Sequence, residues 1–464
     1  MSHPYMANST KDMKQEMLNE IGVDSIDDLF SAIPSDHVTK SEINLPPALT
    51  SEMSLKRHMK GILEHNEDCE NNLSFLGGGI WQHHVPSICD TVVNRYEFLT
   101  PAWGNGETDH GRLQTWFEYA SQLGELVDMD MVCLPVYTWG NAAGHAIRMA
   151  TRLTGKKRVL LPETVCPERL AVIRTFCQPE EMENSIEVGE IASNPKTGML
   201  DLDDLKQKSS DSIGAIYIEL PSYLGVIEAQ AKEIGEIAKE HGIEFIIGVD
   251  PSSLGILNTP ASLGADIVVG TTQPLGVHMH GGGGLGGFIA TRDEERYAYE
   301  HNSILISAVR TIKPGEIAFE RTLLEQSSYG LREEGNDFIG TSVFLWAISN
   351  AVYMATLGPK GFQELGERII RNSHYAAQEF AKLPGVELLF KNNFFKEFVL
   401  CYDGANKTVE EVNKALRKKG IFGGIDLSRE FPEYGQSALW AVTEIFEKED
   451  IDRAVEALKE VVTK

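Results

Sequence analysis

Basic residues are few in this chain of 464 residues. Lysine and arginine together number 42 against 68 aspartates and glutamates, so the formal net charge is −26. This balance argues against a broad basic surface for nucleic acid or anionic membrane, and we expect neither as a partner. In the simplest interpretation the acidity serves solubility; attraction of a cationic partner patch is the alternative.

Paired cysteines and long apolar runs are also lacking. No C-x-x-C pair occurs, which favours a reducing cytosol over a disulfide framework or a zinc site, and we predict a cytoplasmic protein. The opening residues, MSHPYMANSTKDMKQEM, show no basic region followed by an apolar run, as a secretory signal would. No apolar stretch reaches the roughly 18 residues of a membrane span. The six cysteines are scattered at Cys69, Cys89, Cys133, Cys166, Cys177 and Cys401.

Three common catalytic and nucleotide-binding motifs are missing. The chain has no G-x-G-x-x-G after its first strand, no G-K-[ST] phosphate loop and no G-x-S-x-G. Nucleotide binding and serine hydrolysis therefore have no support in the sequence.

The residue pattern that is present predicts three regions. Residues 1–70 have too little apolar content for a core of their own and are expected to form a helical arm that packs on another surface. Residues 71–325 alternate strands and helices, which predicts a large α/β domain with a mostly parallel sheet. Residues 326–464 are expected to form linking helices and a small α+β domain. The strands expected in the large domain are Arg158–Leu161, Ala215–Leu220, Glu244–Asp250, Asp266–Gly270 and Gly287–Thr291.

An acidic residue ends one of these predicted strands. EFIIGVD (244–250) runs into a PSS turn, and the strand DIVVGT (266–271) follows. In the large domain of pyridoxal-phosphate enzymes, an Asp at the first strand end holds the pyridinium nitrogen, and a Lys after the next strand binds the aldehyde carbon. Asp250 suits the first role, but residues 271–288 contain no lysine. Capping of the PSS turn is the alternative role for Asp250.

A strand-to-helix junction at VYTWGNAAGHA (136–146) is a second candidate for cofactor binding. Backbone amides at a helix N-terminus bind phosphate, and Thr138, Gly140 and Asn141 suit that geometry, although Trp139 is bulky for it. The alternative is an N-capped helix that packs on the sheet.

Histidines and glycines form the remaining candidates. Gly281–Gly284 follow His278 and His280, and a glycine run lets backbone amides approach an anion or another chain. A tight turn between strands is the alternative. The two histidines lack acidic or cysteine partners at ligand spacing, so we predict no metal and expect them to donate hydrogen bonds near a phosphate or a partner. His83 and His84 follow GGGIW in a loop and are either substrate-facing or solvated.

Segments along nearly the whole chain resemble the first subunit of the two-chain glycine decarboxylase, the P-protein of the glycine cleavage system. Their order and spacing carry the resemblance. They are EMLNEIGVDSIDDLFSAIP, LPPALTSEM, LSFLGGG, LPETVCPERLAVIRT, ELPSYLGVIE, GVDPSSLGILNTPASLGADIVVG, GGFIATR, LGPKGFQELGER, LPGVELLF, NNFFKEFVL and GIFGGIDL.

The resemblance implies an aminotransferase-like large domain, of the pyridoxal-phosphate-dependent transferase fold type I. It also implies a heterotetramer with two copies of each chain, in which this chain lacks the Schiff-base lysine and the partner beta subunit holds pyridoxal 5′-phosphate. Pro274 stands about where the partner's lysine would fall. The implied reaction decarboxylates glycine and passes the aminomethyl group to a lipoyl carrier protein.

The loops expected to face the site depart from the family pattern. The loop LTPAWGNGETDHG keeps only Glu107 and Gly111, and VHMHGGGG replaces a serine-, leucine- and phenylalanine-rich stretch. LREEGNDFIGTSVF replaces a basic segment, and Lys396 stands where asparagine is usual. We therefore expect a paralogue retuned for another amine, carrier or acceptor. The residues expected to face substrate are His83, His84, Glu107 and His110, and those expected near the cofactor are Asp250, Thr138, Asn141, His278 and His280.

Two other functions remain open at this point. A non-catalytic scaffold or regulatory subunit of a pyridoxal enzyme is favoured by the missing lysine and disfavoured by the His- and Gly-rich loops. A self-sufficient pyridoxal enzyme would need a lysine elsewhere, whereas a pyridoxamine-phosphate enzyme would need none.

Overall fold

The computed structural model describes residues 3, 5–39, 41, 43–99, 106–178, 183–322, 331, 335–336, 339 and 342–463, with the backbone alone described at residues 7 and 106–111. The chain divides into two compact units, Met1–Glu67 and Asp68–Lys464. Each unit is described by itself.

The first unit consists of two helices and short turns. Helices α1 (Lys11–Ile21) and α2 (Glu52–Leu63) contain no buried residue. Apolar side chains such as Met17 and Ile62 are about half exposed. The described residues of this unit therefore form no core of their own.

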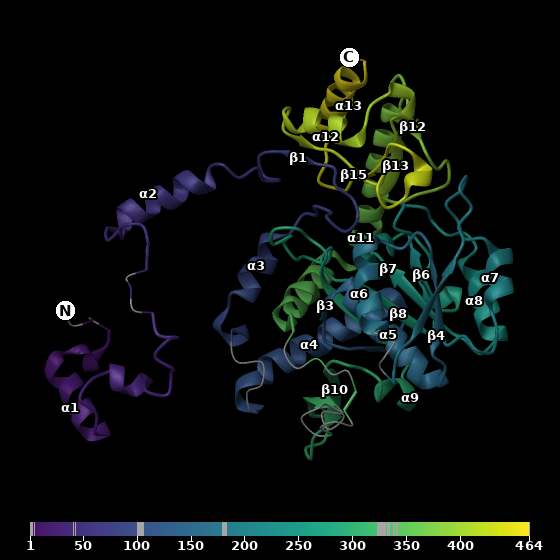
Figure 1. Cartoon of the computed structure of the whole chain (residues 1–464). Coiled ribbons are helices and arrows are strands. Elements are labelled where there is room, and N and C mark those ends of the chain that lie inside the picture. Colours follow the sequence, from purple (N-terminus) through teal and green to yellow (C-terminus); the bar gives the residue numbers. More distant parts are fainter. Residues whose placement is uncertain are drawn as a thin grey trace. The chain divides into compact units, whose positions relative to one another are not determined.

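The second unit is built on an eight-stranded main sheet with a mostly parallel centre, as the sequence predicts (Figure 1). The five central strands are parallel in the order β8-β7-β6-β4-β5, and β9 pairs antiparallel with β8, β2 and β3. The strands are β2 (Met131–Val132), β3 (Val136–Thr138), β4 (Arg158–Pro162), β5 (Glu187–Ile191), β6 (Ala215–Leu220), β7 (Glu244–Val249), β8 (Ile267–Thr271) and β9 (Leu285–Thr291).

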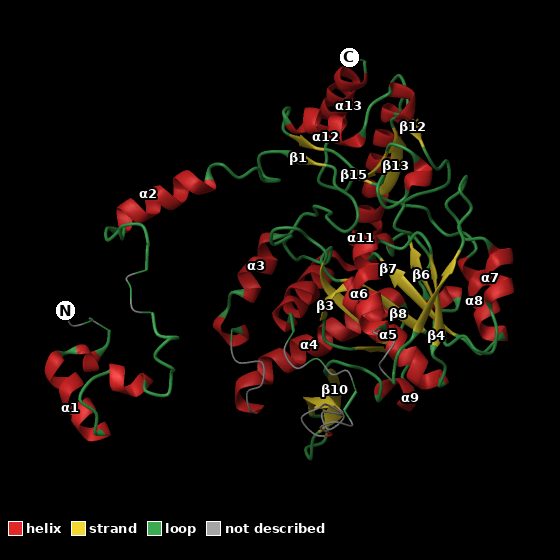
Figure 2. Ribbon diagram, viewed as in Figure 1, coloured by secondary structure: helices red, strands yellow, loops and turns green. Residues whose placement is uncertain are grey.

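Alternating side chains of this sheet enter two separate cores. On β6, for example, Ile216 belongs to one apolar cluster and Tyr217 to the other. Burial on both faces explains the nearly continuous apolar sequences of the central strands. Helices therefore lie on both sides of the strands (Figure 2). They are α3 (Ser87–Val93), α4 (Gly106–Val127), α5 (Trp139–Thr154), α6 (Pro167–Cys177), α7 (Leu202–Lys208), α8 (Ala231–Glu240), α9 (Glu295–Ala298) and α11 (Phe344–Phe380).

The C-terminal region forms a smaller sheet with its own core. The helix α11 reaches it after a kink at Gly358, whose φ of 59° is followed by Pro359. Thr408 and Glu411 form the capping box expected from the sequence. The elements are β12 (Glu387–Leu388), β13 (Glu397–Cys401), α12 (Val409–Arg417), β14 (Ile421–Phe422), β15 (Ile425–Asp426), β16 (Ser437–Ala441) and α13 (Lys448–Val462).

Two connections extend beyond these sheets. The hairpin β10 (Leu305–Arg310) and β11 (Ile317–Thr322) is antiparallel. Strand β1 (Leu73–Ser74) pairs with β14, and Leu76 bridges Trp440. Residues 73–76, expected at the start of the large domain, thus pair with strands of the smaller C-terminal region. No described helix has the length and apolar content needed to cross a bilayer.

Candidate functional site

Asp250 lies directly after β7, at the edge of the main sheet where parallel strands end and ligands usually bind. Its carboxylate is buried and accepts hydrogen bonds from the Ser252 amide at 3.1 Å and from the Ser252 hydroxyl at 2.8 Å. Asp250 therefore caps the PSS turn, the plainer of the two roles expected for it. It also makes a second contact, to a lysine from the small sheet.

Lys396, directly before β13, reaches this carboxylate. Its Nζ lies 2.7 Å from Asp250 Oδ2, and its side chain is 2% exposed. The ammonium also donates to His83 Nε2 at 2.9 Å and to Ser252 Oγ at 3.3 Å. It lies 3.6 Å from the centre of the Trp81 ring, within the range of a cation–π contact. Burial lowers the pKa of Lys396, and the neighbouring Asp250 opposes that change.

His83 connects this lysine to a second carboxylate. Its Nδ1 lies 2.8 Å from Glu444 Oε2, and the His84 amide donates to Glu444 Oε1 at 2.8 Å. His83 therefore lies between the Lys396 amine at Nε2 and the Glu444 carboxylate at Nδ1. Burial alone would raise the pKa of Glu444, but its pairing with His83 lowers it to about 2.

The loop that carries Trp81 and His83 is held from two sides. Thr443 Oγ1 donates to the Gln82 carbonyl at 2.6 Å, and Gln273 Nε2 donates to the Trp81 carbonyl at 3.2 Å. Gly283 lies close to the same loop, with φ +79°, and a Cβ there would stand 2.8 Å from the Gly79 carbonyl oxygen. Gly283 therefore permits close backbone packing after β8, whereas a Cβ on the other three glycines would meet no atom within 4 Å. Because Gly281 and Gly284 also have positive φ, a tight turn is sufficient to explain the run.

A buried arginine–glutamate pair adjoins the lysine cluster. Arg169 on α6 binds Glu219 on β6 with two hydrogen bonds, of 2.6 and 2.7 Å. Tyr217 donates to the same carboxylate at 2.9 Å. The guanidinium lies 4.3 Å from the centre of the Trp139 ring. These contacts leave little open space at the sheet edge.

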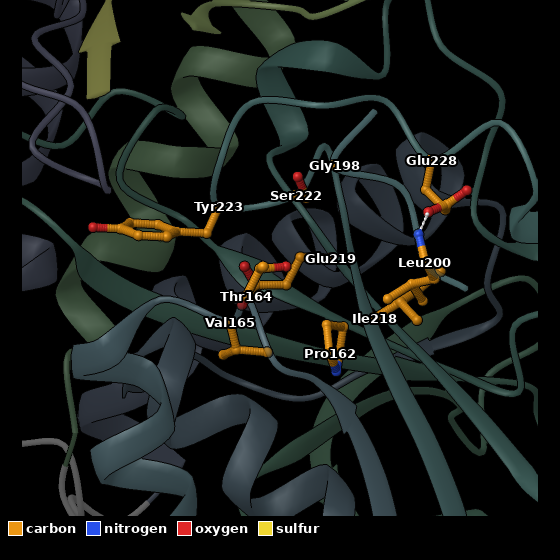
Figure 3. Close-up of a pocket in the computed structure, with 10 residues that line it drawn as sticks. All are labelled: Pro162, Thr164, Val165, Gly198, Leu200, Ile218, Glu219, Ser222, Tyr223 and Glu228. Carbon is orange, nitrogen blue, oxygen red and sulfur yellow. Dashed lines mark hydrogen bonds between the residues drawn. The ribbon is translucent and has the colours of Figure 1, made fainter. Parts of the chain in front are cut away.

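The cavities here are too small for a cofactor. The one lined by Trp139, Arg169, Asp250 and Lys396 measures about 10 Å³. A neighbouring cavity, which shares Ser222, measures about 20 Å³; Figure 3 shows its lining residues, with Glu228 accepting from the Leu200 amide. Ligand pockets are typically about 300–1,000 Å³, so a pyridoxal-phosphate ring does not fit beside Asp250.

The start of α5 has the geometry of an ordinary helix cap. Thr138 Oγ1 accepts from the Asn141 amide at 3.1 Å, and Asn141 Oδ1 is buried without a hydrogen-bond partner. A Cβ on Gly140 would meet Val172 at 3.2 Å, so this glycine lets α5 pack against α6. Phosphate binding by Thr138 and Asn141 stays a prediction.

The other predicted residues lie on different elements. His278 Nε2 contacts Asp90 on α3 at 2.9 Å, with about half of its side chain exposed. His280, with φ 45°, stacks on Trp346 of α11. Among the described residues, neither histidine has a contact with the Asp250 cluster in these interactions. Glu107 and His110 fall on the first turns of α4, and their side chains lie outside the described part of the chain.

Comparison with known proteins establishes the family. A family profile described as "Glycine cleavage system P-protein" matches residues 3–458. The chain belongs to the glycine cleavage system P-protein family. A relative from Staphylothermus marinus, called probable glycine dehydrogenase (decarboxylating) subunit 1, is 37% identical, and the match covers 99% of this chain and 98% of the relative. A relative of the same name from Pyrococcus horikoshii is 37% identical over 100% of both chains. The predicted resemblance to this family is confirmed.

Solved structures agree with the family assignment. A crystal structure of glycine decarboxylase (P-protein) of the glycine cleavage system, in inhibitor-bound form, is 30% identical with a TM-score of 0.87, covering 99% of this chain and 100% of that one. Sphingosine-1-phosphate lyase from Burkholderia pseudomallei has a TM-score of 0.63 at 15% identity, covering 91% of this chain and 93% of that one. These matches confirm the predicted aminotransferase-like fold type I.

The central residue of the Asp250 cluster was not predicted from the sequence. Asp250 and His83 were candidates, but Lys396, Glu444 and Trp81 were not expected as their neighbours. The available signal was the lysine in NNFFKEFVL, directly before an apolar strand. A charged side chain at the start of a buried strand needs a buried partner.

Proposed function

We propose that this chain is the lysine-less alpha subunit of a pyridoxal-phosphate-dependent complex of the glycine-decarboxylase type. The complex decarboxylates an amino acid and transfers the aminomethyl group to a lipoyl carrier. Pyridoxal 5′-phosphate is held mainly by a partner beta subunit, in a cytoplasmic heterotetramer with two copies of each chain. The cofactor supplies an electron sink for loss of the carboxyl group.

The end of β8 is the observation that carries this proposal. Thr271 ends the strand, and Thr272, Gln273 and Pro274 follow where a Schiff-base lysine is expected. The sequence holds no lysine between Lys239 and Lys313. The relatives' printed name, subunit 1 of a glycine dehydrogenase, supports a second subunit that completes the enzyme.

The residues of this chain would complete the wall of the partner's site. His84 is exposed and follows His83, whose side chain is 3% exposed. Glu444, the partner of His83, also fixes the His84 amide. His278 is similarly exposed on the loop after β8. We infer that these histidines, with Glu107 and His110 on α4, face the substrate or its carrier. The loops that carry His110 and His278 depart from the family pattern, and this supports a different amine or acceptor.

Reconstitution with the partner chain tests the proposal. The chain would be co-expressed with a beta subunit of the same family, and pyridoxal phosphate added to each chain and to the complex. We expect a visible absorbance band that borohydride abolishes only when the partner is present, followed by carbon dioxide release from glycine or another screened amine. A borohydride-sensitive band from this chain alone would contradict the proposal.

A non-catalytic scaffold role is the second candidate, favoured by the closed cavity beside Asp250. The same complex distinguishes the two. If replacement of His84 and His278 by alanine leaves turnover and Michaelis constant unchanged while assembly persists, the chain acts only as a scaffold. A loss of turnover in an intact complex supports a site-facing role.

A further inference from the structure

The ammonium of Lys396 contacts the carboxylate of Asp250, the acid at the strand end where this fold binds a cofactor. The fold type I arrangement uses an acid after this strand to bind a protonated ring nitrogen. Here Asp250 Oδ2 lies 2.7 Å from Lys396 Nζ, with both side chains almost fully buried. The lysine ammonium thus occupies the place where the protonated ring nitrogen of the cofactor is expected.

The hydrogen-bonding capacity of Lys396 is fully used. An ammonium has three N–H donors, and three acceptors surround this one: Asp250 Oδ2, His83 Nε2 and Ser252 Oγ. The Trp81 ring covers the same cation at 3.6 Å. A buried charge pair is stable only when geometry and hydrogen bonding are this complete. All three N–H donors of Lys396 are therefore used within the protein, and none is left for a ligand.

The position of the amine excludes a Schiff-base role for it in this arrangement. In pyridoxal phosphate the aldehyde carbon and the ring nitrogen are on opposite sides of the ring. An amine in contact with the acid that binds the nitrogen is therefore at the wrong end of the ring to bond the aldehyde carbon. The remaining cavity of about 10 Å³ has room for about one water and not for a ring.

We propose that Lys396 is an internal counter-ion that replaces the cofactor's pyridinium at Asp250 and closes this subunit's own ring-binding position. The inference rests on the proposed function, because it explains how the lysine-less subunit keeps its buried acid without a cofactor. The closed cluster, held by His83 and Glu444, also fixes the loop that carries His84.

A double-mutant cycle on the full chain tests the charge pairing. The variants are Lys396→Met, Asp250→Asn and the two together, with exposed Lys206→Met and Glu233→Gln as the matched control pair. We expect each single cluster variant to lower the thermal unfolding midpoint by roughly 5 °C or more, because one buried charge is left alone. The double variant should lie closer to wild type than either single variant. Equal or additive losses in the double variant would overturn the proposal.

Ligand binding tests the closure without any variant that must fold. The probe is pyridoxamine 5′-phosphate, which keeps the ring nitrogen and phosphate but has no aldehyde to react with surface lysines. We expect no saturable binding to the wild-type chain alone by calorimetry, up to about a hundred-fold above the concentration that saturates the complex with its partner. Saturable binding that Asp250→Asn weakens ten-fold or more would overturn the proposal.

The two proposals fail in different ways. If the complex is active but the isolated chain binds the probe at Asp250, only the internal counter-ion is wrong. If the cycle shows strong coupling while no beta subunit complex turns over any amine, the proposed function is wrong and the counter-ion stands.

Discussion

The two units of this chain distribute charge and apolar surface in opposite ways. The second unit buries charged groups at the edge of its main sheet, where Lys396 and Arg169 are paired with Asp250 and Glu219. The first unit leaves the apolar side chains of α1 and α2 exposed and buries none of their residues. Buried charge must be satisfied within the fold, whereas exposed apolar surface is stabilised only by a later contact. The sheet edge is therefore complete in itself, and the first unit is incomplete.

The largest expected effect comes from breaking a buried pair at the sheet edge. Arg169→Met should lower the free energy of unfolding by about 3–5 kcal/mol, because it leaves Glu219 buried and without its cation. Denaturant unfolding measures the loss. The matched control is Lys206→Met, whose exposed pair with Glu233 should contribute no measurable stability. Similar losses in both variants would remove the distinction between the closed edge and the surface.

Glu444 should make the stability of the second unit depend on pH. Its pKa in the folded chain is about 2, below an ordinary glutamate, so its contribution is present above about pH 4.5 and is lost as the pH falls toward 2. Integrated over that window, the loss is about 3 kcal/mol. We expect Glu444→Gln to have a flatter stability profile than wild type between pH 5 and pH 2. Parallel profiles would show that the His83 contact does not hold this carboxylate.

Glu397, in the same region, should respond with the opposite sign. Burial raises its pKa to about 7, so the folded state resists ionisation that the unfolded chain accepts above about pH 4.5. The resulting cost grows between pH 4.5 and pH 7 to about 3 kcal/mol at most. Glu397→Gln keeps an acceptor for the Gly78 amide, which now bonds Oε1 at 2.6 Å. We expect this variant to gain stability over wild type at pH 8 and not at pH 4; a gain at both would contradict the assignment.

The difference between the two regions also explains which elements could be predicted from the sequence. Continuous apolar strands such as 215–220 are predictable because burial on both faces leaves a local pattern. Strand β5, EVGEI, is the outermost strand of the main sheet and is half exposed. Its apolar pattern is therefore weak, and the strand was not expected from the sequence. The thin apolar content of residues 1–70 predicts an arm for the same local reason.

The candidate site depends on contacts that no local pattern encodes. Asp250 is recognisable because it ends a strand, but its partner Lys396 is 146 residues away in sequence. His83 and Glu444 are likewise joined only by folding, across 361 positions. The same holds for the closure of the cavity, because it requires side chains from the main sheet and from the small sheet together. The residue types at the strand end predicted a cofactor site. Whether the cavity there is open depends on packing between residues that are far apart in sequence.

The smallest expected effect lies in the first unit. Leu55→Ser or Ile62→Ser on α2 should change the unfolding free energy of the isolated chain by no more than about 0.5 kcal/mol, because both side chains are already about half exposed. If the arm packs on a partner, the same variants should weaken co-purification with the beta subunit. Lys56→Gln, an exposed polar change on the same helix, serves as control. A loss of several kcal/mol in the isolated chain would mean that α2 already packs against its own chain, and the contrast between an incomplete first unit and a complete sheet edge would fail.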